Sequence, residues 1–177
     1  AKKMGCKIIA FFSGGKMEKF CIENKINYRK IEKFHSPRSS FVSFLYSMIH
    51  VLELIIPVKK EDIENSITEL EKTRDNISSN NLDSTNEALH LAMSIDKIPL
   101  IYYPWGLEAA AVRFKSSLQE NAKTHAIIED VVEASHNGIV SWEIKSNVEP
   151  ILLQGKDDFI KTKERWKIFE EYFKDNE

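Results

Sequence analysis

Cysteine is scarce in this sequence, where Cys6 and Cys21 are the only thiols among 177 residues. Two cysteines do not make the disulfide framework of a small secreted domain, and no group of Cys and His has the spacing of a zinc site. The first residues also lack a signal-peptide pattern. Together these absences favour a reducing, cytoplasmic location.

A surplus of basic charge is missing as well. Lys plus Arg number 25 and Asp plus Glu number 27, a balance that argues against a dedicated nucleic-acid binder. Residues 39–58 are apolar and long enough to be checked as a membrane span, but they include His50 and Glu53. Because a central acid costs about 3 kcal/mol on insertion scales, we expect a buried helix there and no membrane span.

Short apolar runs separated by turns organise the first part of the chain. Residues 7–12 (KIIAFF) predict a buried strand of the parallel-sheet kind, followed by the turn Ser13-Gly14-Gly15. A helix is expected from Lys16, and residues 26–31 alternate like a second strand. This order predicts one βαβ unit.

Two helices and a polar break are predicted next. The helix expected over residues 38–56 starts after Pro37, is apolar nearly all round and is therefore predicted to be buried. Residues 61–76 are charged and amphipathic. The polar stretch 78–84 is the best candidate for a domain boundary.

The strand–helix alternation then repeats. Strands are predicted over 98–103 (IPLIYY), 126–128 and 149–153, and helices over 86–95, over 107–121 and from 157 onward. Alternation of this kind indicates an α/β fold with a parallel sheet. Ligands of such sheets bind beyond the carboxyl ends of the strands, which places Ser13-Gly14-Gly15, Pro104-Trp105-Gly106 and the loop around His136 on the functional edge.

Two titratable residues stand out in the second half. Glu120 projects from the predicted helix 107–121 on roughly the side opposite its core face, as does Arg113 seven residues earlier. A solvated face is the ordinary explanation, and a catalytic base is the alternative if another element covers the carboxylate. His136 lies in the polar segment EASHNG, so it is either a turn residue without a role or a proton-transfer group.

Two features of the first half can bind anions. Ser13, Gly14 and Gly15 follow a strand and open a helix, where backbone N–H groups bind anions, although a tight turn alone also explains the glycines. The loop is too short for a Walker A motif. Arg38, at a helix start, is either a surface arginine or a partner for a phosphate or enediolate oxygen.

Three segments in order resemble the archaeal-type bifunctional phosphoglucose/phosphomannose isomerases, which are built from two sugar isomerase (SIS) domains. The segments are FFSGGKM followed by SPRSSFVSFLYSMIHVLEL, then KIPLIYYPWGLEAAAVRFKSSLQENAK, and then VVEASHNGIVSWE. The interval of sixteen residues from Glu120 to His136 also matches that family.

The resemblance implies a parallel-sheet, flavodoxin-like SIS fold in two sub-domains. Residues 1–57 are expected to be the C-terminal part of a first SIS domain, 58–82 a helical linker, and 83–177 a second SIS domain truncated at its C-terminus. The family's Ser/Thr-rich phosphate loop and its catalytic Lys are then expected outside this chain.

By the same resemblance, the activity is interconversion of glucose-6-phosphate, and of mannose-6-phosphate as a second possible substrate, with fructose-6-phosphate. Glu120 corresponds to the base, His136 to the ring opener and Arg38 to the group beside the enediolate, with Ser13, Gly14 and Gly15 binding substrate. The resemblance implies no metal or organic cofactor. It does imply a homodimer with shared active sites.

Some neighbours of these residues depart from the family pattern. The family usually has Asn-Glu-Asn where this chain has Gln-Glu-Asn at residues 119–121. It usually has Pro-Glu-Leu-Asn-His-Asn-Glu where this chain has Val-Glu-Ala-Ser-His-Asn-Gly at residues 132–138. Two other functions stay open. One is a non-catalytic SIS module that binds a sugar phosphate and regulates another activity, which needs no Glu/His pair. The other is a purely structural α/β domain.

Overall fold

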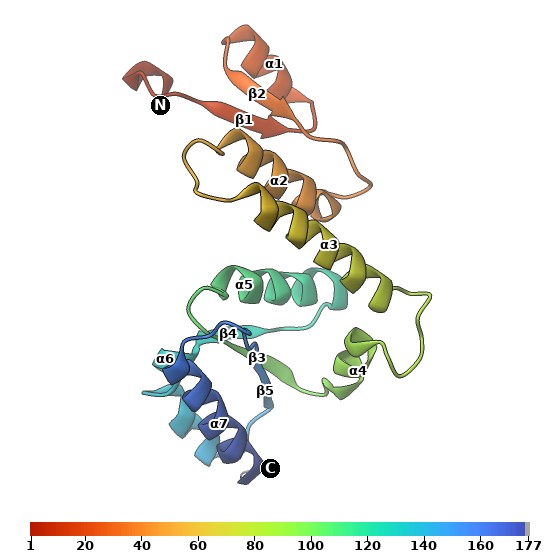
Figure 1. Cartoon of the computed structure of the whole chain (residues 1–177), viewed down its shortest axis with the longest axis vertical. Coiled ribbons are helices and arrows are strands. Elements are labelled where there is room, and N and C mark those ends of the chain that lie inside the picture. Colours follow the sequence, from red (N-terminus) through yellow and green to blue (C-terminus); the bar gives the residue numbers. More distant parts are fainter. Residues whose placement is uncertain (176–177) are drawn as a thin grey trace. The chain divides into compact units, whose positions relative to one another are not determined.

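The computed structural model describes the backbone of residues 1–175 and divides into two compact units, unit 1 over Ala1–Arg74 and unit 2 over Asp75–Glu177. Both units alternate parallel strands with helices (Figure 1), which confirms the predicted α/β class.

Unit 1 is built on a two-stranded parallel sheet with the predicted βαβ connection. Its elements are η1 (Lys2–Met4), β1 (Ile9–Phe12), α1 (Lys16–Glu23), β2 (Asn27–Lys30), η2 (Pro37–Ser40), α2 (Phe41–Val51) and α3 (Lys60–Asn76). Pro37 occupies the first turn of η2, where its missing N–H leaves no bond unmade.

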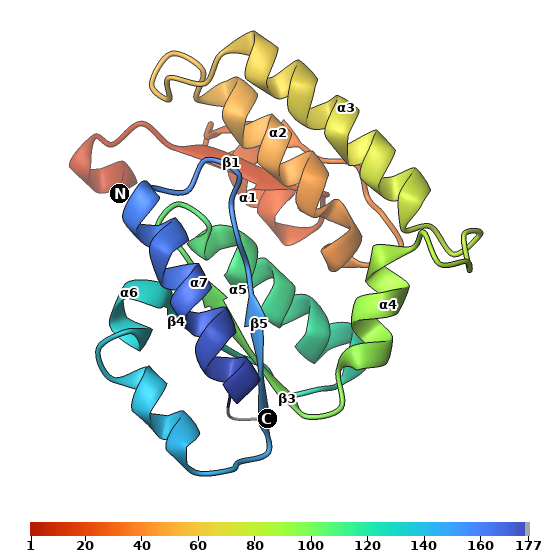
Figure 2. The same cartoon turned by 60° about the horizontal axis from the view of Figure 1, so that its bottom comes forward.

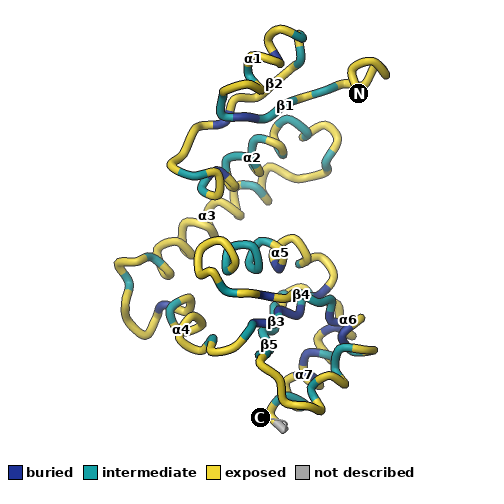
Figure 3. Tube along the Cα trace, turned by 180° about the vertical axis from the view of Figure 1, so that it is seen from behind, coloured by how far each residue is buried: buried dark blue, intermediate teal, exposed yellow. Residues whose placement is uncertain are grey.

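The burial predicted for the apolar elements of unit 1 is wrong. No residue of α2 is buried, and Figure 3 shows this helix as a mixture of intermediate and exposed positions. In β1, only Phe12 is buried. The physical reason is that a sheet of two short strands offers too little surface to cover an apolar helix on all sides. The helix is also shorter than predicted, since it ends at Val51.

No helix within residues 1–175 combines the length and the apolar character that crossing a bilayer requires. The stretch 39–58 that prompted this question is divided among a 3₁₀-turn, the eleven-residue α2 and a series of turns before Pro57.

Unit 2 holds a three-stranded parallel sheet in the order β4-β3-β5. Its elements are α4 (Glu87–Ser94), β3 (Ile98–Tyr103), α5 (Glu108–Ser117), η3 (Leu118–Ala122), β4 (Ile127–Asp130), α6 (Val131–Ala134), η4 (Gly138–Glu143), β5 (Val148–Leu152) and α7 (Ile160–Asp175). All strands predicted from apolar runs are present, and the boundaries of β3 are as predicted.

The main core of unit 2 lies on one face of this sheet. Tyr102 of β3 packs there with residues of α6 and α7, including Trp166 and Phe169. Tyr102 is fully buried, and its ring packs edge to face against that of Phe169, with 5.2 Å between the ring centroids. Helix α5 covers the opposite face with the buried Ala111 (Figures 1 and 2). The sheet is thus held between layers of helix.

Candidate active site

Glu120 lies in a π-helical segment that continues α5. The segment, η3, ends where Lys123 adopts a left-handed conformation (φ 59°), and the Lys123 ammonium donates to the carbonyl oxygen of Glu120 at 2.6 Å. The wider turn of a π-helix changes the angular phase of the side chains, so the face shared by Arg113 and Glu120 cannot be taken from their spacing. Such segments occur frequently at functional sites. The Glu120 side chain is exposed.

His136 lies in the turn that follows α6. Asp130 caps this short helix by accepting from the N–H groups of Val132 (2.8 Å) and Glu133 (3.2 Å). The N–H of His136 in turn donates to the carbonyl oxygen of Glu133 at 2.9 Å. His136 is exposed, which excludes the core histidine that would have removed its candidacy.

Glu120 lies near the amino ends, and His136 near the carboxyl ends, of the strands of the same sheet. Helix α5 starts after the carboxyl end of β3 and runs back to the amino end of β4, so Glu120 is near the edge where the strands begin. His136 follows the carboxyl end of β4 by one short helix. With four to six residues per strand, the two edges are about 13–20 Å apart. The structure therefore does not bring this pair together within one chain.

In unit 1, the turn Ser13-Gly14-Gly15 directly follows a strand, whereas Arg38 lies in η2, which a loop separates from the next strand. The turn follows β1 and Arg38 follows β2, and the two strands are parallel. Gly14 (φ 131°) and Gly15 (φ 78°) adopt conformations that favour glycine, and the N-cap residue of α1 is Gly15, which has no side chain to cap the helix. This turn has the backbone geometry of an anion site.

A carboxylate of the chain already lies beside that turn. Glu18, in the first turn of α1, comes close to Gly14 and forms an ion pair with Lys30 at 2.9 Å. A negative charge at a helix N-terminus is favourable by itself, so Glu18 competes with any external anion at this point. Sequence reasoning missed this neighbour, although its place two residues after Lys16 is visible in the sequence.

Hydroxyl groups next to Arg38 were also missed. The Ser36 and Ser39 oxygens are 3.1 Å apart, and the Ser39 oxygen is 3.2 Å from Nε2 of His35. The serines on both sides of Pro37 and Arg38 were visible in the sequence and could have indicated these hydroxyl groups. Hydroxyl and arginine groups together suit an oxyanion.

Comparison with known proteins decides the family. The family model of the bacterial phospho-glucose isomerase C-terminal SIS domain matches residues 84–177. Over 168 residues, 89% of the chain is 30% identical to a bifunctional phosphoglucose/phosphomannose isomerase of Caldicellulosiruptor bescii. The chain belongs to the phosphoglucose/phosphomannose isomerase family. It spans about half the length (49%) of this curated relative.

The matched SIS region begins just before Asn86, the residue that caps α4 by accepting from the N–H of Leu89 at 3.0 Å. It includes the whole β4-β3-β5 sheet, together with Glu120 and His136. The family resemblance stated on sequence motifs is thus confirmed over most of the chain.

A second group of acids, not anticipated from the isomerase motifs, surrounds the carboxyl end of β4. Burial raises the pKa of Glu129, and the nearby carboxylates of Glu133 and Asp130 raise it further. Burial likewise raises the pKa of Tyr103, with Glu108 and Asp130 adding to the effect. The sequence signal was two acids closing the apolar run of β4, and perturbed groups at this edge are candidates for function.

A hollow of about 360 Å³ opens beside these acids. It is lined by Tyr103, Trp105, Gly106, Glu108, Ala109 and Asp130, and Trp105 is 93% exposed. Within residues 1–175, no three His, Cys, Asp or Glu side chains are grouped so as to hold a metal ion.

Proposed function

We propose that the protein containing this chain interconverts glucose-6-phosphate, and mannose-6-phosphate as a second substrate, with fructose-6-phosphate. The observation that carries the proposal is the 30% identity to a bifunctional phosphoglucose/phosphomannose isomerase over a stretch that contains both Glu120 and His136. Aldose–ketose isomerisation moves a proton between C2 and C1 through an enediolate, which needs a base able to take and return the proton.

In this proposal Glu120 is the base. Its carboxylate removes the proton from C2 and returns it to C1, and Arg38 stabilises the negative charge on the enediolate oxygen. His136 opens the glucose ring by giving a proton to the ring oxygen as the bond from that oxygen to C1 breaks, while the C1 hydroxyl loses its proton to water and becomes the aldehyde carbonyl. These steps move protons only, so they need neither a metal nor an organic cofactor.

The positions of Glu120 and His136 support a homodimer with shared active sites. Both groups must act on one sugar ring, yet within a chain they lie at opposite edges of a sheet whose strands are four to six residues long. A two-fold dimer solves this problem, because each site then combines Glu120 of one subunit with His136 of the partner subunit.

Single variants test the chemistry. We expect Glu120→Gln in the full-length protein to lower the turnover of fructose-6-phosphate by about 10²–10⁴-fold, since an amide is too weak a base. Substrate binding should stay nearly intact. The matched control is Glu164→Gln, a Glu-to-Gln change on the exposed surface of α7 where only an ion pair to Lys161 is lost. Near-normal turnover by Glu120→Gln would mean that another residue is the base, whereas a wild-type protein that binds the sugar phosphate without turning it over would favour a regulatory sugar-phosphate-binding module.

A subunit-mixing experiment tests the shared site. Glu120→Gln and His136→Ala proteins are each expected to be inactive as pure dimers. After subunit exchange in equal amounts, half of the dimers are mixed and each mixed dimer has one intact site, so about a quarter of wild-type activity should return. If no activity returns although exchange is verified with differently tagged subunits, the two residues do not act across a dimer interface.

A further inference from the structure

The carboxylate of Glu129 fills the space beside Gly138. Glu129 is the third residue of β4, and Gly138 begins η4 two residues after His136. A methyl group on Gly138 would lie 2.7 Å from Oε1 and 2.8 Å from Oε2 of Glu129, closer than a carbon and an oxygen approach without a bond.

The other side of the His136 turn is held by a second glutamate. The side-chain amide of Asn137 donates to Oε1 of Glu133 at 2.7 Å, and its backbone N–H donates to the Glu133 carbonyl oxygen at 3.0 Å. The two residues that follow His136 are thus each in contact with a glutamate: Asn137 donates to Glu133, and Gly138 packs against Glu129.

Glu129 connects this turn to the core of unit 2. It is paired in register with Tyr102 on the neighbouring strand, and the Tyr102 hydroxyl accepts from the indole N–H of Trp142 at 2.8 Å. Tyr102 is buried, and Trp142 packs against the same core cluster. The position of the Glu129 side chain is therefore fixed from a rigid part of the fold.

This placement is unfavourable for stability by itself. Burial and the neighbouring carboxylates of Glu133 and Asp130 raise the pKa of Glu129, which means that its ionised form is disfavoured in the folded state. Groups that break such local rules are candidates for a functional role.

We propose that Glu129 is a positioning residue for His136. Its carboxylate occupies the space beside Gly138 and so sets the position of the turn above the carboxyl end of β4. The inference rests on the proposed ring-opening role of His136. A proton-transfer group must lie about 2.6–3.2 Å from its target, and a displacement of about 1 Å can cost about 10²-fold in rate.

Four variants of the full-length protein test the role of shape. Glu129→Gln keeps the shape of the side chain and should retain near-normal turnover of the ring-closed sugar. Glu129→Ala empties the space and Gly138→Ala displaces the carboxylate, so each should lower that turnover by about tenfold or more. The double variant should lose no more than the worse single variant, because both changes act on one contact.

A second substrate separates positioning from general damage. Exchange of the C2 proton in an open-chain analogue bypasses ring opening, so Glu129→Ala and Gly138→Ala should leave it unchanged. Equal losses on both substrates, or normal turnover of the ring-closed sugar by Glu129→Ala, would overturn the inference. If the alanine variant does not fold, Glu129→Asp decides instead, since it withdraws the carboxylate by one methylene group.

His136→Ala tells this failure apart from failure of the proposed function. If His136→Ala also affects both substrates equally, the ring-opening role itself is wrong. If it affects only the ring-closed sugar while the Glu129 variants do not, then His136 opens the ring and Glu129 does not position it.

Discussion

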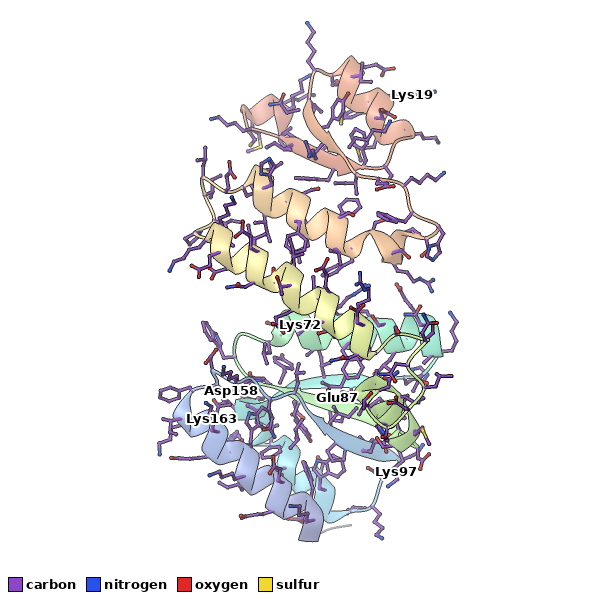
Figure 4. All side chains as sticks on the ribbon, turned by 45° about the vertical axis from the view of Figure 1, so that its right-hand side comes forward. Lys19, Lys72, Glu87, Lys97, Asp158 and Lys163 are labelled. Carbon is purple, nitrogen blue, oxygen red and sulfur yellow. The ribbon has the colours of Figure 1, made fainter. Side chains whose placement is uncertain are left out.

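Replacing Gly155 by alanine is expected to destabilise unit 2 through one carboxylate. Gly155 lies in the loop after β5, and Asp158, labelled in Figure 4, lies just before α7. Oδ2 of Asp158 accepts from the N–H of Gly155 at 2.9 Å and from the indole N–H of Trp166 at 2.8 Å. A methyl group on Gly155 would overlap this carboxylate, because the methyl carbon would lie only 3.2 Å from Cγ of Asp158.

The magnitude follows from the two hydrogen bonds that the displaced carboxylate loses. Trp166 is 3% exposed, so its N–H has little access to water as a replacement. Both bonds are to a charged carboxylate, and such a bond contributes about 1.5–3 kcal/mol; the partly buried N–H of Gly155 can bond to water instead, so the Trp166 bond carries the loss. Gly155 does not adopt a positive φ, so alanine also stabilises by about 0.4–1 kcal/mol through the unfolded state. The net loss should be about 2 kcal/mol.

This loss in unfolding free energy is measured by urea titration, with tryptophan fluorescence as the probe of unfolding. A change of about 2 kcal/mol corresponds to a fall of roughly 4–8 °C in Tm for a chain of this size. The control is the same substitution in an Asp158→Ala background, where the overlap is gone and Gly155→Ala should cost nothing further. An unfolding free energy for Gly155→Ala within about 0.5 kcal/mol of wild type would refute the reasoning.

Three further changes address single contacts. Tyr102→Phe removes the acceptor of the Trp142 N–H and should lower the unfolding free energy by about 1 kcal/mol in urea titrations, unless Trp142 finds another acceptor. Asn86→Ala removes the cap on Leu89 and the bond that the Asn86 amide donates to the carbonyl oxygen of Asn81, and should cost about 1–2 kcal/mol, whereas Asn86→Ser, which keeps a capping oxygen, should cost less. Because the pKa of Glu129 is raised on folding, its ionisation destabilises the folded state as pH rises through that pKa. Glu129→Gln should therefore be more stable than wild type at pH 7, and the difference should vanish below the ordinary glutamate pKa; a constant difference at every pH would contradict the sign.

Local sequence patterns were sufficient to locate the strands and most helices. The run IPLIYY predicted β3 with its observed ends because it is apolar, β-branched and closed by Pro104 and Gly106. Chain order then implied the parallel sheet, since each pair of strands is joined through a helix. Candidate residues such as Glu120 and His136 were also visible, because ordered motifs belong to the chain itself.

Only the tertiary structure decided how those pieces meet. The apolar pattern of α2 predicted burial, but burial depends on the surface that other segments supply, and the two-stranded sheet of unit 1 supplies too little. The interval between Glu120 and His136 said nothing of their separation, because the direction of α5 and β4 places them at opposite sheet edges. The contact of Glu129 with Gly138 joins a strand to a turn beyond the next helix. Local patterns record the preferences of neighbouring residues, whereas these three features depend on how separate helices, strands and turns pack against one another.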